Sequence, residues 1–183
     1  MCYGVLIDSR LTMADYVVSV CRSAYYHLRQ IRPTVQLLMP DGSKTLVQAF
    51  ISGHLDYCNL LLYGMTDSLF QYLQSVQNAA ARLITRTGLH EHITPVLREL
   101  HWLPFQRCVD FKLATFMYKT LHGRIPRYFS GDCQLISDLS RQLQSSDTFT
   151  FAMPWTRTCL GDRSFCSCQT TDMEQSAGRS APS

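Results

Sequence analysis

The sequence is poor in charged residues and has no long apolar run. Charged residues make up 17% of the 183 positions, and apolar residues make up 46%; about 25% charged is usual. This composition excludes an intrinsically disordered chain and a solvated coiled coil. No run approaches the roughly 18 apolar residues of a membrane span, and charged residues interrupt the first 30 positions, so no signal peptide is expected. We therefore expect an intracellular protein of the cytoplasm or nucleus, neither secreted nor bound to membranes.

Cysteine pairs with the spacing of a zinc site are also missing. The chain has eight cysteines, and most are scattered singly; only Cys166 and Cys168 lie close together. Without a Cys-x2-Cys pair, zinc has no strong signature, and a disulfide framework belongs to small secreted scaffolds. We expect reduced thiols, with Cys21, Cys58 and Cys108 acting as small buried apolar residues.

The familiar catalytic motifs are absent as well. There is no glycine-rich phosphate loop, no Gly-x-Ser-x-Gly and no pair of catalytic carboxylates. Two clusters leave a cysteine- or metal-dependent hydrolase as the least favoured alternative. His54 and Cys58 could touch at i and i+4 on a helix, and His90 and His92 flank Glu91, although side chains two residues apart diverge. We expect no enzyme, no catalytic residue, no metal and no cofactor.

Basic residues are concentrated in the first part of the chain. Residues 1–131 hold 13 basic and eight acidic side chains, whereas residues 132–183 hold four and six. Basic side chains one or two helical turns apart can follow phosphates, although solvated helix faces show the same pattern. The candidates for nucleic-acid contacts are three such pairs: Arg22 and Arg29, Arg82 and Arg86, and Lys112 and Lys119.

Apolar residues recur at helical spacing through the first two thirds of the chain, which predicts an antiparallel helical bundle. The residues expected at helix ends are Pro33 as a stop, Asp41 as a start, Gly88 as a stop, Thr94 as an N-cap and Pro104 as a start. The faces expected to point inward are Leu46, Ala49, Phe50 and Gly53 in the second helix, Leu69, Leu73, Val76, Ala80, Leu83 and Ile84 in the third, and Val109, Leu113, Phe116, Met117 and Leu121 in the last.

The expected fold class is therefore mainly α, divided into four regions. Residues 1–10 contain a short strand over residues 3–8, and residues 11–133 form the helical domain. Residues 134–165 are an extended region with weak strands near 148–165, and residues 166–183 form a disordered tail.

Seven segments, taken in order, carry a resemblance to one family. They are Leu46–Ile51, Leu55–Asn59, Leu60–Gly64, Val76–Leu83, His92–Pro95, Leu100–Pro104 and Tyr118–Gly123. This ordered set is specific, and it closely resembles the region downstream of the polymerase palm in jockey-like non-LTR (LINE-type) retrotransposon reverse transcriptases. The resemblance covers about residues 3–165. Tyr3–Asp8 looks like the strand that leaves the primer grip, although the family usually has Leu where Tyr3 stands.

The resemblance implies that the helical domain is a thumb, which packs on the palm and supports the RNA or DNA template–primer. The paired aspartates of the family's Tyr-x-Asp-Asp turn lie upstream of this region, and Asp56-Tyr57 is not that motif. Two-metal catalysis needs such carboxylates, so the resemblance implies a catalytically inactive fragment that binds template–primer weakly or not at all. The face that lost its palm could support self-association. The alternative is a small helical protein- or nucleic-acid-binding module recruited from such an element.

The tail departs from the family in a way that suggests a broken reading frame. After Phe165 the family continues toward Trp-Asn-Ser-Leu-Pro, whereas Met173–Ala177 reads Met-Glu-Gln-Ser-Ala. One set of codons for these five residues, ATG GAA CAG TCT GCC, would encode Trp-Asn-Ser-Leu-Pro when read in another frame. We therefore expect residues 166–183 to be out-of-frame translation.

Overall fold

The computed structural model describes residues 4–6 and 12–124. The chain divides into two compact units, residues 1–109 and 110–183, and the last long helix crosses their boundary. The helices are α1 (Ala14–Leu37), α2 (Pro40–Val47), the π-helical η1 (Gln48–Ser52), α3 (Gly53–Asp56), the 3₁₀-helical η2 (Asn59–Leu62), α4 (Asp67–Thr85), α5 (Ile93–Glu99) and α6 (Phe105–Leu121).

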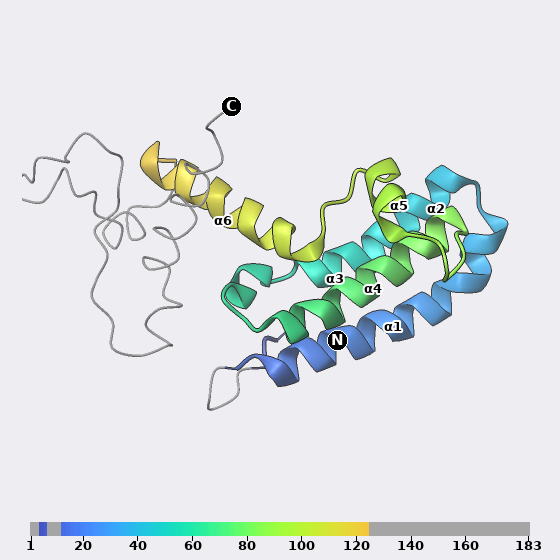
Figure 1. Cartoon of the computed structure of the whole chain (residues 1–183), viewed down its shortest axis with the longest axis horizontal. Helices are drawn as coiled ribbons and strands as arrows, with labels where there is room; N and C mark the ends of the chain where they lie inside the picture. Colours follow the sequence, from blue (N-terminus) through green and yellow to red (C-terminus); the bar gives the residue numbers. More distant parts are fainter. Residues whose placement is uncertain (1–3, 7–11, 125–183) are drawn as a thin grey trace, which may run out of the picture. The chain divides into compact units, whose positions relative to one another are not determined.

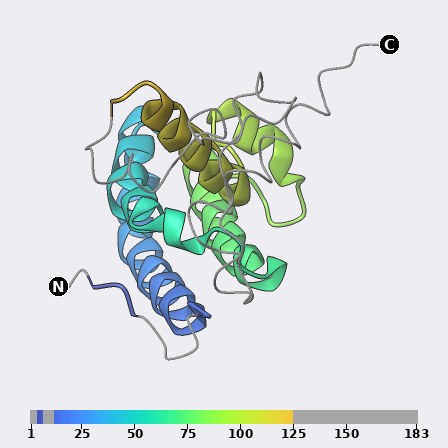
Figure 2. The same cartoon turned by 90° about the vertical axis from the view of Figure 1, so that its left-hand side faces the viewer.

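The first unit is built from three passes of helix. α1 runs in one direction, the continuous segment α2–η1–α3 returns, and α4 runs again in the direction of α1 (Figure 1). α4 contacts α1, α2, η1 and α5, so it lies at the centre of the packing (Figure 2). Because consecutive passes are antiparallel, α1 and α4 lie side by side and parallel. The prediction of a mainly helical protein is confirmed for the described residues.

α1 continues beyond the stop that the sequence predicts. Pro33 lies inside the helix, which ends at Leu37. The proline ring is exposed, so the Arg29 carbonyl that loses its N–H donor can be hydrated. Val35 is only 1% exposed, and its carbonyl accepts hydrogen bonds from the Ser43 hydroxyl at 3.2 Å and from the Leu38 N–H at 3.3 Å. Burial of this last turn therefore holds the helix together past the proline.

The second pass buries a different face from the one that the sequence predicts. Its buried residues are Ser43, Val47, Ile51 and Leu55, whereas Ala49, Phe50 and Gly53 are exposed and Leu46 is half-buried. The buried residues are spaced by four, and in a regular α-helix this spacing drifts by about 40° per step. The π-helical turn of η1 has i→i+5 hydrogen bonds and holds more residues per turn, so it keeps this spacing aligned with the core.

α4 follows the predicted pattern closely. Of the six residues expected to point inward, Leu73, Val76, Ala80 and Ile84 are buried, and the other two are half-buried. The helix ends at Thr85, three residues before the predicted stop at Gly88, and Arg86 follows it in the left-handed conformation at φ 57°.

The ends of the later helices are close to their predicted positions. The prediction of Thr94 as an N-cap is wrong, because His92 is the N-cap and α5 begins at Ile93. α6 begins directly after Pro104, as predicted. Of the expected inward residues of α6, Val109, Leu113 and Met117 are buried and Phe116 is half-buried. The side chain of Leu121 lies outside the described part.

The prediction of a strand over residues 3–8 is wrong for residues 4–6, the part of it that the structure describes. Residues 4–6 form no strand, and neither does any other described residue. A strand needs a neighbour to pair its backbone N–H and C=O groups, and the described part of the chain offers none. The weak strands near 148–165 and the tail 166–183 lie outside the described residues. No helix among the described residues is long and apolar enough to cross a membrane.

Candidate functional site

A groove lined by four arginines lies between α1 and α4. Its volume is about 590 Å³. Arg29, Arg32, Arg82 and Arg86 are among the residues that line it. The lining is completed by Tyr25, Leu28, Gln36, Ala79, Leu83, Thr87 and Leu89. We call this feature the arginine groove.

The arginine groove combines positive charge with a lack of counter-charge. No carboxylate within the described residues forms an ion pair with any of its four guanidinium groups, and the hydrogen bonds of Arg82 and Arg86 go to backbone carbonyls. Arg82 donates from Nη2 to the Glu91 carbonyl at 3.2 Å, and its buried Nε–H has no acceptor. Like charges gathered without a partner favour an anionic ligand.

Arg86 also has a structural role that the sequence did not indicate. Its Nη2 donates to the carbonyls of Gln36 at 3.0 Å and Leu38 at 3.5 Å. These carbonyls lie at the C-terminal end of α1, which has no basic residue in its last turn. Arg86 therefore supplies from another helix the positive charge that a helix C-terminus favours.

We expect Arg86→Ala to lower the free energy of unfolding by about 1–2 kcal/mol, because it removes two hydrogen bonds from a charged donor. Arg86→Gly removes the same bonds but relieves the left-handed backbone at φ 57°, so it should cost about 1 kcal/mol less than alanine. Urea denaturation of both variants measures this difference. Equal costs for the two variants would contradict the left-handed conformation.

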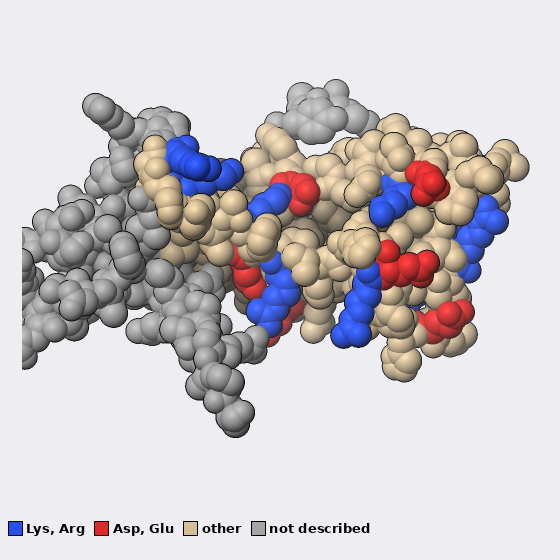
Figure 3. All heavy atoms as spheres, turned by 90° about the horizontal axis from the view of Figure 1, so that it is seen from above, with Lys and Arg blue, Asp and Glu red and all other residues tan. Residues whose placement is uncertain are grey.

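The other predicted contact residues do not join the groove. Arg22 is exposed on α1 but does not line it. Lys112 and Lys119 belong to the second unit, where Lys112 is half-buried and Lys119 exposed. Conversely, Arg32 lines the groove although it was not predicted as a contact residue, and its i, i+3 spacing from Arg29 was the available signal. On the face of the molecule in Figure 3, acidic and basic side chains are interspersed, so that face is not a continuous basic surface.

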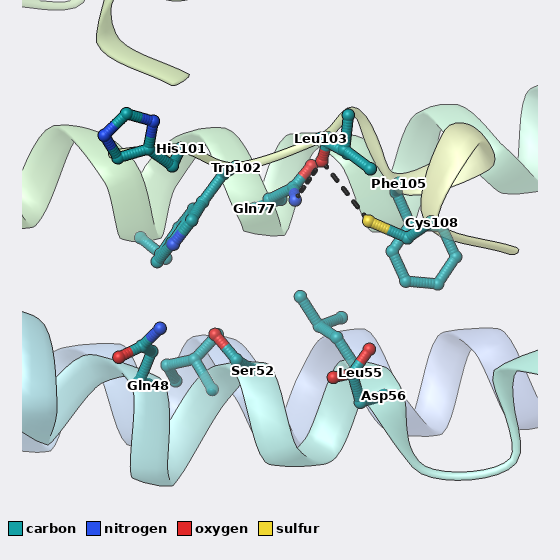
Figure 4. A pocket seen from close by; sticks show the side chains of 12 residues that line it. Gln48, Ser52, Leu55, Asp56, Gln77, His101, Trp102, Leu103, Phe105 and Cys108 are labelled. Atoms are coloured by element: carbon teal, nitrogen blue, oxygen red, sulfur yellow. Dashed lines mark hydrogen bonds between the residues drawn. The ribbon is translucent and has the colours of Figure 1, made fainter. Parts of the chain in front are cut away.

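A second hollow lies between the second helical pass and the segment that leads into α6. Its volume is about 250 Å³, and we call it the Trp102 pocket (Figure 4). One wall consists of Gln48, Ile51, Ser52, Leu55 and Asp56, and the other of Gln77, Ala80, His101, Trp102, Leu103, Phe105 and Cys108. Trp102 points into the gap toward Gln48 and Ser52, whereas the His101 ring points away from it.

Side chains of α4 hold the upper wall of this pocket in place. Gln77 is 8% exposed and donates from Nε2 to the Leu103 carbonyl at 2.8 Å. Gln74 Oε1 accepts a hydrogen bond from the Phe105 N–H at 2.8 Å, which satisfies a free donor at the start of α6. The Cys108 thiol also contacts the Leu103 carbonyl, at 3.4 Å. The wall is therefore fixed by hydrogen bonds before any ligand binds.

The two candidate catalytic clusters, His54 with Cys58 and His90 with His92, do not have the arrangement that catalysis or metal binding would need. α3 ends at Asp56, and Cys58 lies beyond it in the left-handed conformation at φ 53°, so His54 and Cys58 do not share a helix. His54 instead stacks near His27, with ring centroids 5.0 Å apart. His90 and His92 are both exposed. Within the described residues, no three His, Cys, Asp or Glu side chains gather as a metal site.

The three cysteines among the described residues, Cys21, Cys58 and Cys108, are half-buried rather than fully buried as predicted. Burial raises the pKa of the Cys21 thiol to about 11, so this thiol stays protonated and weakly nucleophilic at neutral pH.

Comparisons of the chain with protein-family models, with curated proteins and with solved structures found no match.

Proposed function

We propose that the chain is a catalytically inactive, thumb-like fragment of a non-LTR retrotransposon reverse transcriptase, and that its arginine groove holds a nucleic-acid backbone. The observation that carries the proposal is that four arginines line one groove, Arg29 and Arg32 from α1, Arg82 from α4, and Arg86 directly after α4, with no carboxylate paired to them in the described residues. Arginine is well suited to phosphate because its planar donors bind two oxygens at once.

The geometry also explains why binding should follow the backbone rather than the base sequence. Arg29 and Arg32 are exposed, and neither makes a hydrogen bond within the described residues, so both are available to phosphates. Contacts to phosphate fix the position of a strand but carry no sequence information. We therefore expect binding that weakens steeply with salt and varies little between sequences.

The test measures the affinity for a labelled 20-base-pair duplex by fluorescence anisotropy over a range of salt concentrations. Arg29→Gln combined with Arg32→Gln should make the slope of log K against log[salt] shallower by about 2, one for each lost phosphate contact. Neither side chain supports the fold, so stability should not change.

The matched control is Arg22→Gln combined with Arg98→Gln, which removes the same charge from exposed positions outside the groove. Its slope should be close to that of the unmodified chain. Equal slopes for the two double variants would place binding elsewhere, and an affinity independent of salt would reject the proposal.

A second candidate function, docking of a protein by apolar contacts, is favoured by one observation. The three most exposed large apolar side chains among the described residues are Leu37 at 89%, Leu89 at 82% and Met39 at 79%. Leu89 lines the arginine groove, and the other two flank Leu38, whose carbonyl Arg86 contacts. Because apolar docking does not weaken as salt rises, the salt titration also separates these two functions.

A further inference from the structure

The Trp102 pocket contains polar groups that the fold does not use. The side-chain amide of Gln48, the hydroxyl of Ser52 and the indole N–H of Trp102 have no hydrogen-bond partner within the described residues. All three face the gap in Figure 4. By contrast, the opposite wall is tied down by Gln77 and Cys108, both bonded to the Leu103 carbonyl. The pocket therefore has one wall held by hydrogen bonds, and it contains three polar groups, from Gln48, Ser52 and Trp102, that make no hydrogen bond within the described residues.

The remainder of the lining defines what kind of ligand these groups could hold. Ile51, Leu55, Ala80 and Phe105 supply an apolar floor. No lysine or arginine lines the pocket, and the carboxylate of Asp56 stands at its edge. A phosphate or carboxylate group would be repelled there, so the ligand is uncharged. The volume of about 250 Å³ is below the range of about 300–1,000 Å³ that drug-sized ligands occupy, which suits a single ring system.

The C-terminal end of α5 positions Trp102 beside the pocket. His101 adopts the left-handed conformation at φ 57°, which is uncommon for a residue with a side chain. The Trp102 N–H donates to the Leu97 carbonyl at 2.8 Å, and the His101 N–H donates to the Arg98 carbonyl at 3.0 Å, which is the common capping pattern at a helix C-terminus. The capping of α5 therefore fixes the backbone that carries Trp102 and so sets the direction of its side chain.

We propose that the Trp102 pocket binds an unpaired purine base, with its ring against the Trp102 indole and its edge paired with the Gln48 amide and the Ser52 hydroxyl. A glutamine amide matches the adjacent donor and acceptor of adenine, and aromatic side chains stack on unpaired bases. The inference rests on the proposed function for the source of the base, which is a strand held by its backbone elsewhere on the chain.

Adenosine tests the pocket without involving the arginine groove, because it carries no phosphate. The chain has two tryptophans, so Trp155→Phe leaves Trp102 as the single tryptophan, and adenosine should quench its fluorescence in a saturable way. Gln48→Met should weaken adenosine binding about tenfold by removing the paired edge, and Ser52→Ala should weaken it severalfold. Because Gln48 is exposed, the variant keeps its fold, which thermal denaturation checks.

The matched control is Gln71→Met, an exposed glutamine of α4 outside the pocket, which should bind adenosine as the unmodified chain does. Absence of saturable quenching, or equal affinity for the Gln48→Met variant, would overturn the proposal. The Arg29→Gln and Arg32→Gln double variant should bind adenosine normally, so failure of the pocket and failure of the arginine groove are seen separately.

A competition experiment identifies the source of the base. A short single-stranded oligodeoxyadenylate should displace adenosine, whereas the same strand with abasic positions should not. Equal displacement by both strands would reject base recognition. If neither strand competes, the pocket takes a free nucleoside and the link to a strand is rejected.

Discussion

Replacement of Ile51 by alanine is expected to lower the free energy of unfolding by about 2–5 kcal/mol, the usual cost of a large-to-small change in a core. Ile51 lies in the π-helical turn η1 and is fully buried. Its neighbours are fixed by three helical passes, so the site cannot collapse easily around the lost atoms. Urea denaturation followed by circular dichroism measures the change, provided that the slope of the free energy of unfolding against urea concentration is the same in both proteins.

The neighbouring aromatic residue is the matched control. Phe50 is 42% exposed, and its nearest ring partner is His27, with centroids 6.1 Å apart. We expect Phe50→Ala to cost about 1 kcal/mol or less, as for other partly exposed positions. If Phe50→Ala were the more costly variant, the helix would present the face that a regular 3.6-residue period predicts, and the π-helical turn would be wrong.

Replacement of Pro33 by alanine is expected to raise the free energy of unfolding by about 1–3 kcal/mol. Pro33 lies inside α1 with its ring exposed. Alanine would supply the missing N–H to the Arg29 carbonyl and would remove the poorest helix former from an exposed position. Proline also restricts the unfolded chain, which offsets part of this gain.

Thr34→Ala serves as the control for this change, because Thr34 is the next exposed residue of the same helix. It should raise stability by only about 0.5 kcal/mol, the difference in helix propensity. Thermal and urea unfolding of both variants give the comparison. A loss of stability in Pro33→Ala would mean that the proline shapes the C-terminal turn of α1 rather than weakening it.

The sequence predicted α4 well because one physical effect dominates there. Its 19 residues contain no proline or glycine, and burial against several neighbours imposes a regular stripe. Leu73 and Val76, which are almost fully buried, could therefore be placed on the core face from spacing alone. The start of α6 after Pro104 was also predictable, since proline favours the beginning of a helix.

The face of the second pass could not be predicted in the same way. Leu46 and Phe50 fit a 3.6-residue period, but the π-helical turn changes the period within the helix. Nothing in the residues Gln48–Ser52 marks such a turn, because it depends on packing against α1 and α4. A stripe of residues four apart, from Val47 through Ile51 to Leu55, was the available signal.

The candidate site was only partly predictable because it depends on tertiary placement. Arg29 and Arg82 were both identified as candidates, but their convergence in one groove follows from the parallel packing of α1 and α4. The backbone carbonyls that hold Arg86 belong to the end of α1, and no local pattern indicates them. The Trp102 pocket requires the second pass to face the 101–108 segment, which periodicity cannot show.

The parallel packing of α1 and α4 sets an order of events during translation. Tyr25 bonds Ser75 at 3.0 Å, and Arg86 bonds Gln36; each pair is separated by 50 residues. At about 5–20 residues per second, a ribosome needs roughly 3–10 s to make that intervening length. During this interval the second pass can cover α1 only in part. A nascent chain that stalls before residue 85 exposes the apolar face of α1 to chaperones, so a ribosome pause in this stretch favours aggregation more than one placed later.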